Sequence, residues 1–138
     1  MQLIVFKLTN HFYGFTTEKI EEITKPLTST IIPQSPSWIK GLVNLRGQIM
    51  TLIDLDGLLN EDRPSNELCY NNTVIVNTED NPIALMVGKV IGVTDIDPQL
   101  IQTVDGEDSL VQGYVSAYNE MVSIIDIDII LKEKEEVS

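Results

Sequence analysis

Two pairs of acidic residues have the types and spacing that could support chemistry. Asp54 and Asp56 follow one apolar run, and Asp126 and Asp128 follow another. One apolar residue separates the acids of each pair, so both carboxylates of a pair lie on one face of an extended strand. Such a pair could bind a hard cation or share a proton in acid–base catalysis. Alternatively, the first Asp ends a strand in a local hydrogen bond and the second caps the following helical turn. A cation-binding or hydrolytic β protein therefore stays open as an alternative function.

Other catalytic or metal-binding constellations are missing from the sequence. The only histidine, His11, has no partner suggested by spacing, and the single cysteine, Cys69, cannot form a zinc site with it alone. Neither of the common glycine-rich phosphate-binding motifs occurs. The sequence therefore favours a protein that is not an enzyme and uses no metal or cofactor.

The stretch from Ile39 to Leu55, IKGLVNLRGQIMTLIDL, predicts an apolar hairpin with a guanidinium near its turn. The turn is expected at residues 46–48. By strand parity Asn44 and Arg46 share one face, whereas the valine and leucine between them point the other way. If those two apolar side chains fill a core, Arg46 faces outward.

Two explanations for Arg46 remain open at this point. It could pair with a nearby carboxylate such as Glu22 or simply be solvated, which would be a structural role. It could instead be a charged anchor beside an apolar patch formed by Ile20 and Ile23, a mixture that is typical of protein interfaces.

Composition narrows the possible partners and location. Nine basic residues against 21 acidic residues give a net charge of −12, which repels phosphate backbones, so we expect no nucleic-acid partner. No apolar run approaches the roughly 20 residues of a membrane helix, so we expect no direct membrane insertion. The start MQLIVFKL lacks the flanks of a signal peptide, and the single cysteine suggests a reducing compartment. The sequence therefore predicts a cytoplasmic protein.

Two blocks of sequence recur at nearly the same spacing. The block FYGFTTEKIEEIT, residues 12–24, aligns with PIALMVGKVIGVT, residues 82–94, seventy positions later. The block GLVNLRGQIMTLIDLDGLL, residues 41–59, aligns with GYVSAYNEMVSIIDIDIIL, residues 113–131, seventy-two positions later. Any two hairpins have some similarity, but the agreement of separate blocks favours an internal repeat.

The repeat predicts an all-β fold made of two small modules within one domain, with roughly residues 12–59 and 82–131 as the repeated parts. A module of this size would be only marginally stable alone, so we expect the two modules to share a hydrophobic core. Both parities of residues 49–53 and 121–125 are largely apolar, which predicts strands covered on both faces. The polar residues 60–72 are expected to form a surface loop between the halves.

Four segments, in this order, resemble the CheW family of chemotaxis adaptors: VFKLTNHFYGFTTEKIEEI, IIPQSPSWIKGLVNLRGQIMTLIDL, VIVNTEDNPIALMVGKVIGV and GYVSAYNEMVSIIDIDIIL. The resemblance runs from about Leu3 to Leu131. Its most specific part is P-x-x-I-x-G-L-V-N-L-R-G, Pro36 to Gly47, followed by the IDL of residues 53–55. It implies one CheW-like domain over residues 1–138, built of two five-stranded, SH3-like β-barrels around a common apolar core, with one or two short helices.

The resemblance also implies a function, partners and a location. Members of the family are non-enzymatic adaptors that couple methyl-accepting chemoreceptors to the histidine kinase CheA and help to assemble signalling arrays. The implied partners are the cytoplasmic tip of a chemoreceptor and the regulatory domain of CheA. The implied location is the cytoplasm, at chemoreceptor arrays beneath the inner membrane. A stand-alone adaptor is expected, because the sequence contains no fused receiver or kinase module.

The family's receptor-facing positions match Thr17, Ile20, Glu22 and Ile23, with Arg46 as the polar anchor. In the family, a helical receptor hairpin lies in a groove between the barrels, where apolar side chains supply affinity and a charged hydrogen bond fixes register. Thr17 departs from the pattern, because the family often has a branched aliphatic residue there. The kinase contact is implied to be barrel against barrel. The resemblance assigns it no residues in this sequence.

Overall fold

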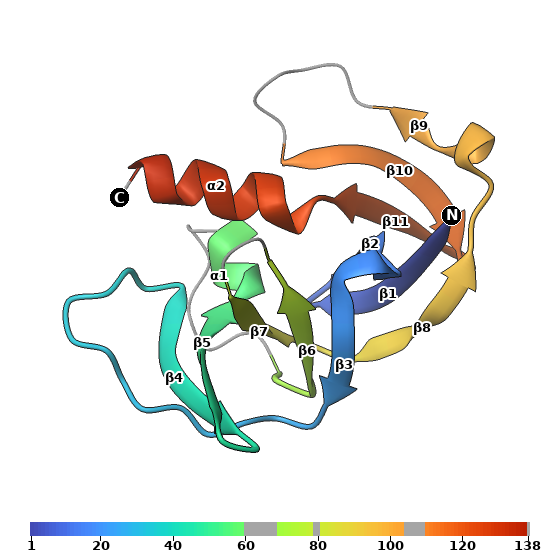
Figure 1. Ribbon diagram of the computed structural model, residues 1–138. Helices are drawn as coiled ribbons and strands as arrows, with labels where there is room; N and C mark the ends of the chain where they lie inside the picture. The colour runs from blue at the N-terminus through green and yellow to red at the C-terminus, as the bar shows by residue number, and fades with distance from the viewer. Residues whose placement is uncertain (60–68, 79–80, 104–109, 138) are drawn as a thin grey trace. The chain divides into compact units, whose positions relative to one another are not determined.

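The computed structural model describes residues 1–59, 69–78, 81–103 and 110–137, the side chains of 133–137 excepted. The chain divides into two compact units (Figure 1). Unit 1 comprises Met1–Glu18 and Val90–Ser138, and unit 2 comprises Lys19–Lys89. Most of the surface loop expected at residues 60–72 lies outside the described residues. Among the described residues, no helix is both long enough and apolar enough to cross a membrane.

Unit 1 contains a six-stranded sheet in the order β8-β1-β2-β11-β10-β9. The pairing of β2 with β11 is parallel, and the other neighbours are antiparallel. A 3-10 turn, Thr17–Lys19, follows β2, and another, Pro98–Leu100, precedes β9. The bounds are β1 Gln2–Leu8, β2 His11–Thr16, β8 Val90–Asp95, β9 Gln102–Thr103, β10 Val111–Ala117, β11 Glu120–Ile125 and helix α2 Ile127–Val137.

Unit 2 contains a five-stranded sheet in the order β3-β6-β7-β5-β4. The pairing of β5 with β7 is parallel, and the other neighbours are antiparallel. The bounds are β3 Ile20–Thr24, β4 Ile39–Leu45, β5 Gln48–Asp54, helix α1 Leu55–Leu59, β6 Asn72–Asn77 and β7 Pro82–Val87.

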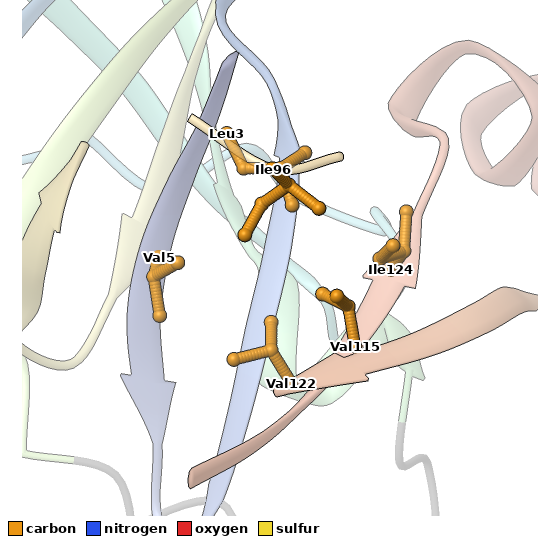
Figure 2. Packing of buried hydrophobic residues seen from close by; sticks show 6 residues of the cluster. All are labelled: Leu3, Val5, Ile96, Val115, Val122 and Ile124. Carbon is orange, nitrogen blue, oxygen red and sulfur yellow. The ribbon is translucent and has the colours of Figure 1, made fainter. Parts of the chain in front are cut away.

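Each unit has its own cluster of buried apolar side chains, supplied mainly by alternate positions of its strands and, in unit 1, also by Ile96 directly after β8. The cluster of unit 1 is shown in Figure 2 and consists of Leu3, Val5, Ile96, Val115, Val122 and Ile124. The cluster of unit 2 consists of Val43, Met50, Leu52, Ile75, Ala84 and Met86. Burying one such aliphatic side chain stabilises a fold by about 1.5–3 kcal/mol, so these clusters hold the strands in register.

The sequence repeat corresponds to a repeat in strand pairing. Hairpin β4–β5 pairs Gly41 with Leu52, and hairpin β10–β11 pairs Gly113 with Ile124, seventy-two positions later. Every other pair of the two hairpins is displaced by the same interval. Both hairpins also contain a bulge, between Ile39 and Gly41 in one and between Val111 and Gly113 in the other.

The spatial units do not coincide with the repeated segments 12–59 and 82–131. Strand β3 follows β2 in the chain but pairs with β6 of unit 2. Strand β8 follows β7 but pairs with β1 of unit 1. Unit 2 therefore combines β3, β4 and β5 with β6 and β7, and unit 1 combines β8, β9, β10 and β11 with β1 and β2. Each repeated segment thus contributes strands to both units.

The predicted all-β class, with two SH3-like β modules and short helices, is confirmed. Unit 1 differs from the expected five strands because the two-residue β9 adds a sixth at the edge beside β10. The predicted sharing of one core between the modules stays a prediction.

Candidate functional site

The hairpin β4–β5 turns through two residues with left-handed backbone, Arg46 with φ 52° and Gly47 with φ 86°. This two-residue turn fits the right-handed twist of the flanking strands. The backbone N–H of Gly47 donates a hydrogen bond of 2.9 Å to Oδ1 of Asn44, which holds the turn. Arg46 therefore stands at the tip of the hairpin, as expected.

The guanidinium of Arg46 forms an ion pair with Glu22, and its Nη2 donates to the Oε1 of that carboxylate. Glu22 lies in β3, whereas Arg46 ends the hairpin of β4, and these strands are opposite edges of the sheet. The sheet is therefore curled until its two edges meet, as in a small barrel. We call a contact between a hairpin-turn residue and the opposite edge strand the closing contact.

Arg46 is paired and exposed at the same time, so the two explanations left open by the sequence are compatible. Its side chain is 70% exposed, and that of Glu22 is 31% exposed. A guanidinium has five N–H donors, and at this exposure part of the fork faces solvent. The ion pair fixes the direction of the guanidinium and leaves it accessible to a partner.

Strand β3 supplies the apolar part of the site. Ile23 is 40% exposed and Ile20 is half-buried. A bulge between Ile20 and Glu22 shifts the pairing with β6, while exposure still alternates along β3, with Ile20 and Glu22 less exposed than Ile23. Four of the five predicted receptor-facing residues, Ile20, Glu22, Ile23 and Arg46, thus belong to one unit.

The fifth predicted residue, Thr17, belongs to unit 1. It begins the 3-10 turn after β2, and its hydroxyl donates a hydrogen bond of 3.0 Å to Oε1 of Gln2. This contact gives Thr17 a local structural role. Its part in a site with the other four residues stays a prediction.

The outer face of the hairpin carries two apolar residues that the sequence analysis did not assign. Leu42 is 40% exposed and Ile49 is 65% exposed. Ile49 pairs with Asn44, and Leu42 pairs with Thr51, so these four side chains share the outward face. Strand parity could have identified Leu42, because it lies on the same face of the strand as Asn44 and Arg46.

The prediction that residues 49–53 and 121–125 are covered on both faces is wrong at their first apolar residues. Ile49 and Met121, which is 58% exposed, lie beside the hairpin turns. Ile53 and Ile125, at the far ends of the same strands, are buried. Coverage of the second face therefore increases along each strand away from the turn, which periodicity alone does not reveal.

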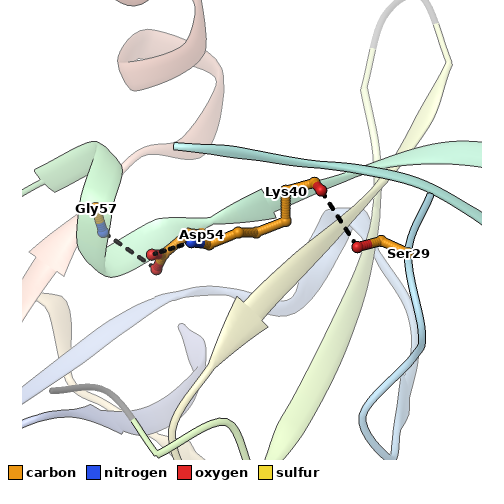
Figure 3. Close-up of polar contacts among 4 residues, drawn as sticks. All are labelled: Ser29, Lys40, Asp54 and Gly57. Atoms are coloured by element: carbon orange, nitrogen blue, oxygen red, sulfur yellow. Dashed lines mark hydrogen bonds and ion pairs between the residues drawn. The ribbon is translucent and has the colours of Figure 1, made fainter. Parts of the chain in front are cut away.

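Asp54 stands at the junction of β5 and α1 and is almost completely buried, with 3% exposure (Figure 3). Its Oδ1 accepts a hydrogen bond of 3.1 Å from the N–H of Gly57, and its Oδ2 lies 3.9 Å from Nζ of Lys40. The carbonyl of Lys40 accepts a hydrogen bond of 3.2 Å from the hydroxyl of Ser29. Asp54 therefore caps α1 and neutralises a lysine in the bulge of β4.

Asp126 has the same capping position in unit 1. Its Oδ1 accepts a hydrogen bond of 3.3 Å from the N–H of Ile129, in the first turn of α2. The first acid of each pair is thus the N-cap, and the second acid, Asp56 or Asp128, lies inside the first helical turn. The expectation that the second acid caps the helix is wrong, because each helix begins immediately after the first acid.

The cation-binding or hydrolytic alternative is not supported. The carboxylate of Asp54 caps helix α1 and forms an ion pair with Lys40. The carboxylate of Asp126 caps helix α2. Over the described parts of the chain, no group of three His, Cys, Asp or Glu side chains is arranged to hold a metal ion.

Comparison with known proteins agrees with this geometry. The family model described as "CheW-like domain" matches residues 2–135. The chain is 28% identical to the chemotaxis protein CheW of Treponema pallidum, over 97% of this chain and 84% of that protein. It is 27% identical to the chemotaxis protein CheW of Helicobacter pylori, over 96% of this chain and 82% of that protein.

A solved structure is also similar. The crystal structure of the scaffolding protein TtCheW from Thermoanaerobacter tengcongensis matches with a TM-score of 0.79 and 27% identity, covering 94% of this chain and 86% of that one. Sequence and fold agree over nearly the whole chain, and the matching segment includes the hairpin with Arg46. The chain therefore belongs to the CheW-like family.

Proposed function

We propose that this protein is a non-enzymatic chemotaxis adaptor that couples methyl-accepting chemoreceptors to the histidine kinase CheA and helps to assemble signalling arrays. Membership of the CheW-like family supports this role, as do relatives that are chemotaxis proteins and a structural neighbour that is a scaffolding protein. An adaptor needs interaction surfaces and no reacting groups, which suits a chain in which the first acid of each pair serves as a helix cap.

The observation that carries the proposal is the arrangement of Arg46 in unit 2. Its guanidinium is held by Glu22 and remains largely exposed, with Ile20 and Ile23 on the same strand as Glu22. A helical receptor tip presents an apolar stripe with polar residues beside it, which matches such a surface. The isoleucines would supply affinity, and the preoriented guanidinium would fix the register of the bound helix.

Two further residues follow from the geometry of the hairpin. Leu42 and Ile49 are exposed on its outer face, so we include them as apolar contacts near the anchor. Thr17 is proposed as a receptor contact by family resemblance alone. A threonine buries less apolar surface than a branched aliphatic residue, so its contribution to affinity should be smaller than that of the isoleucines.

The second proposed partner is the regulatory domain of CheA, through a contact of one β module against another. We place the protein in the cytoplasm, at chemoreceptor arrays beneath the inner membrane. The net charge of −12 speaks against nucleic acid and against direct binding to anionic lipid. No residues of the kinase contact are proposed.

The receptor contact is tested by Arg46→Asp, with binding measured to a purified cytoplasmic fragment of a methyl-accepting chemoreceptor. Reversing the anchor's charge should weaken binding at least about tenfold, which corresponds to about 1.4 kcal/mol. Lys89→Asp is the matched control, since it makes the same charge change at another exposed position of unit 2. Unchanged binding by a folded Arg46→Asp variant would remove Arg46 from the receptor site.

The adaptor role as a whole is tested by gel filtration of the protein with the receptor fragment and the regulatory domain of CheA. A ternary complex that elutes together supports coupling. Failure of the unaltered protein to bind either partner under conditions where both partners are folded would overturn the proposed function.

A further inference from the structure

The hairpin β10–β11 of unit 1 repeats the backbone of the receptor-site hairpin with different side chains. Its turn consists of Tyr118, with φ 53°, and Asn119, with φ 62°. These residues stand seventy-two positions after Arg46 and Gly47, in the same register and with the same left-handed backbone. Tyr118 therefore occupies in unit 1 the place that Arg46 occupies in unit 2.

The partner of this position is also repeated. In β3, Glu22 comes directly after the bulge and pairs with Ile75. In β8, Gly92 comes directly after the corresponding irregularity and pairs with Val5 of the unit 1 core. Gly92 therefore stands where unit 2 has the carboxylate that binds Arg46.

Tyr118 covers Gly92. A Cβ added at Gly92 would lie 2.5 Å from the hydroxyl oxygen of Tyr118 and 3.2 Å from its Cζ. The φ of Gly92 lies outside the left-handed range, so its backbone conformation does not require glycine. The ring of Tyr118 gives a steric reason for the missing side chain.

We propose that Tyr118 and Gly92 form an uncharged closing contact, which fixes the β10–β11 hairpin against the edge strand β8. In unit 2 the ion pair of Arg46 and Glu22 holds the hairpin to the opposite edge strand. In unit 1 the packing of Tyr118 on Gly92 has this role. While the ring of Tyr118 occupies this place, a residue with a Cβ does not fit at position 92 unless the ring moves. The inference is independent of the receptor role, because it concerns unit 1 and its own stability.

The test is the effect of Gly92→Ala in three backgrounds, measured as the thermal midpoint of unfolding. With Tyr118 present, the new methyl group must displace the phenol, which is the end of a 46% exposed side chain and can move, so the midpoint should fall by about 1–2 °C. With Tyr118→Phe the fall should be smaller, because the closest atom is gone. With Tyr118→Ser the sign should reverse, to a rise of about 2 °C, because alanine in an unobstructed strand is favoured over glycine.

Tyr114→Ser is the matched control, since Tyr114 is an exposed tyrosine of the same hairpin and is not among the nearest neighbours of a Cβ at Gly92. In this background Gly92→Ala should lower the midpoint as much as in the unaltered protein. The same change in midpoint in all four backgrounds would overturn the proposal. If Gly92→Ala alone prevents folding, recovery of folding by added Tyr118→Ser supports the contact, and failure to recover refutes it.

Hydrogen exchange gives a second readout that a general loss of stability would not reproduce. Tyr118→Ser should accelerate exchange of the amides in β8, Val90–Asp95, more than that of the amides in β6 of unit 2. Equal acceleration in both strands would count against a contact that holds β8.

Discussion

Hairpins β4–β5 and β10–β11 have the same register, the same bulge and the same left-handed turn, but their closing contacts differ. Unit 2 closes with an ion pair between Arg46 and Glu22. Unit 1 has Tyr118 over Gly92. A single backbone geometry thus accepts either charge or packing at this contact. The ion pair of unit 2 also leaves the guanidinium of Arg46 exposed, so unit 2 is the better candidate for binding a polar group of a partner.

The strand ends of the two units differ in a similar way. Asp54 and Asp126 are equivalent helix caps, but only Asp54 is buried and faces a lysine from the neighbouring bulge. In unit 1, Gln112 occupies the position equivalent to Lys40 and is exposed. Unit 2 thus adds to its helix cap an ion pair between the buried Asp54 and the partly exposed Lys40. In unit 1 the described contact of Asp126 is the cap.

Alanine substitutions at the bulge glycines should give the largest difference between the units in lost unfolding free energy. Gly41 has φ 142°, and a Cβ there would overlap the carbonyl of Thr30, which is paired with Leu42. Gly41→Ala should therefore cost about 3 kcal/mol of unfolding free energy in urea denaturation. Gly113→Ala should cost about 1–2 kcal/mol, because its Cβ would meet the short edge strand β9, which can shift. Equal losses would show that β9 is as firmly held as the segment at Thr30.

Removing the helix caps should give the next largest difference between the units in lost unfolding free energy. Asp54→Ala removes the cap and leaves Lys40 without its buried partner, so a loss of about 2 kcal/mol is expected. Asp126→Ala removes only a cap, at about 1 kcal/mol. Asp54→Asn is the control, because an amide oxygen can still accept from Gly57 while the charge is lost. If Asp54→Asn is as stable as the unaltered protein, the ion pair adds nothing and the comparison fails.

Much of this organisation could be predicted from the sequence. The hairpin from Ile39 to Leu55 was predicted from its apolar runs and the glycine beside Arg46, and the repeat predicted its counterpart in the other module. The division of β2 from β3, and of β7 from β8, between the two units could not be predicted, because periodicity identifies strands and says nothing about which strands pair. The partners of Asp54 were missed for a related reason, since Lys40 reaches it only across a bulge that shifts the register.

The site was predicted less completely than the fold. Ile20, Glu22, Ile23 and Arg46 were identified through family resemblance, and the structure places them in one unit. The pairing of Arg46 with Glu22 was only one of several possibilities in the sequence, because 24 positions separate the two residues. Their contact depends on how far the sheet curls, which is a property of the assembled strands.

Exchanging the closing contacts should sharpen the comparison further. Glu22→Gly with Arg46→Tyr gives unit 2 the closing contact of unit 1, so the fold should lose less than about 1 kcal/mol of stability in urea denaturation. Receptor binding should fall as it does for Arg46→Asp, because the exposed guanidinium is gone. Retained binding by the exchanged variant would show that closure, and not charge, is what the receptor requires.

The smallest effect is expected from removing charge alone in unit 2. Glu22→Gln leaves the left-handed turn and the size of the side chain unchanged, so any loss of stability comes from the ion pair. An exposed pair of this kind contributes about 0.2–1 kcal/mol, and salt near 1 M, where the Debye length is about 3 Å, should abolish that difference. The loss caused by Tyr118→Ser in unit 1 should persist at the same salt concentration, because packing is not screened. A salt-insensitive loss for Glu22→Gln would mean that both units close by packing. Since closure gains so little from the ion pair, the orientation of an exposed guanidinium is the better physical reason for an arginine at this turn.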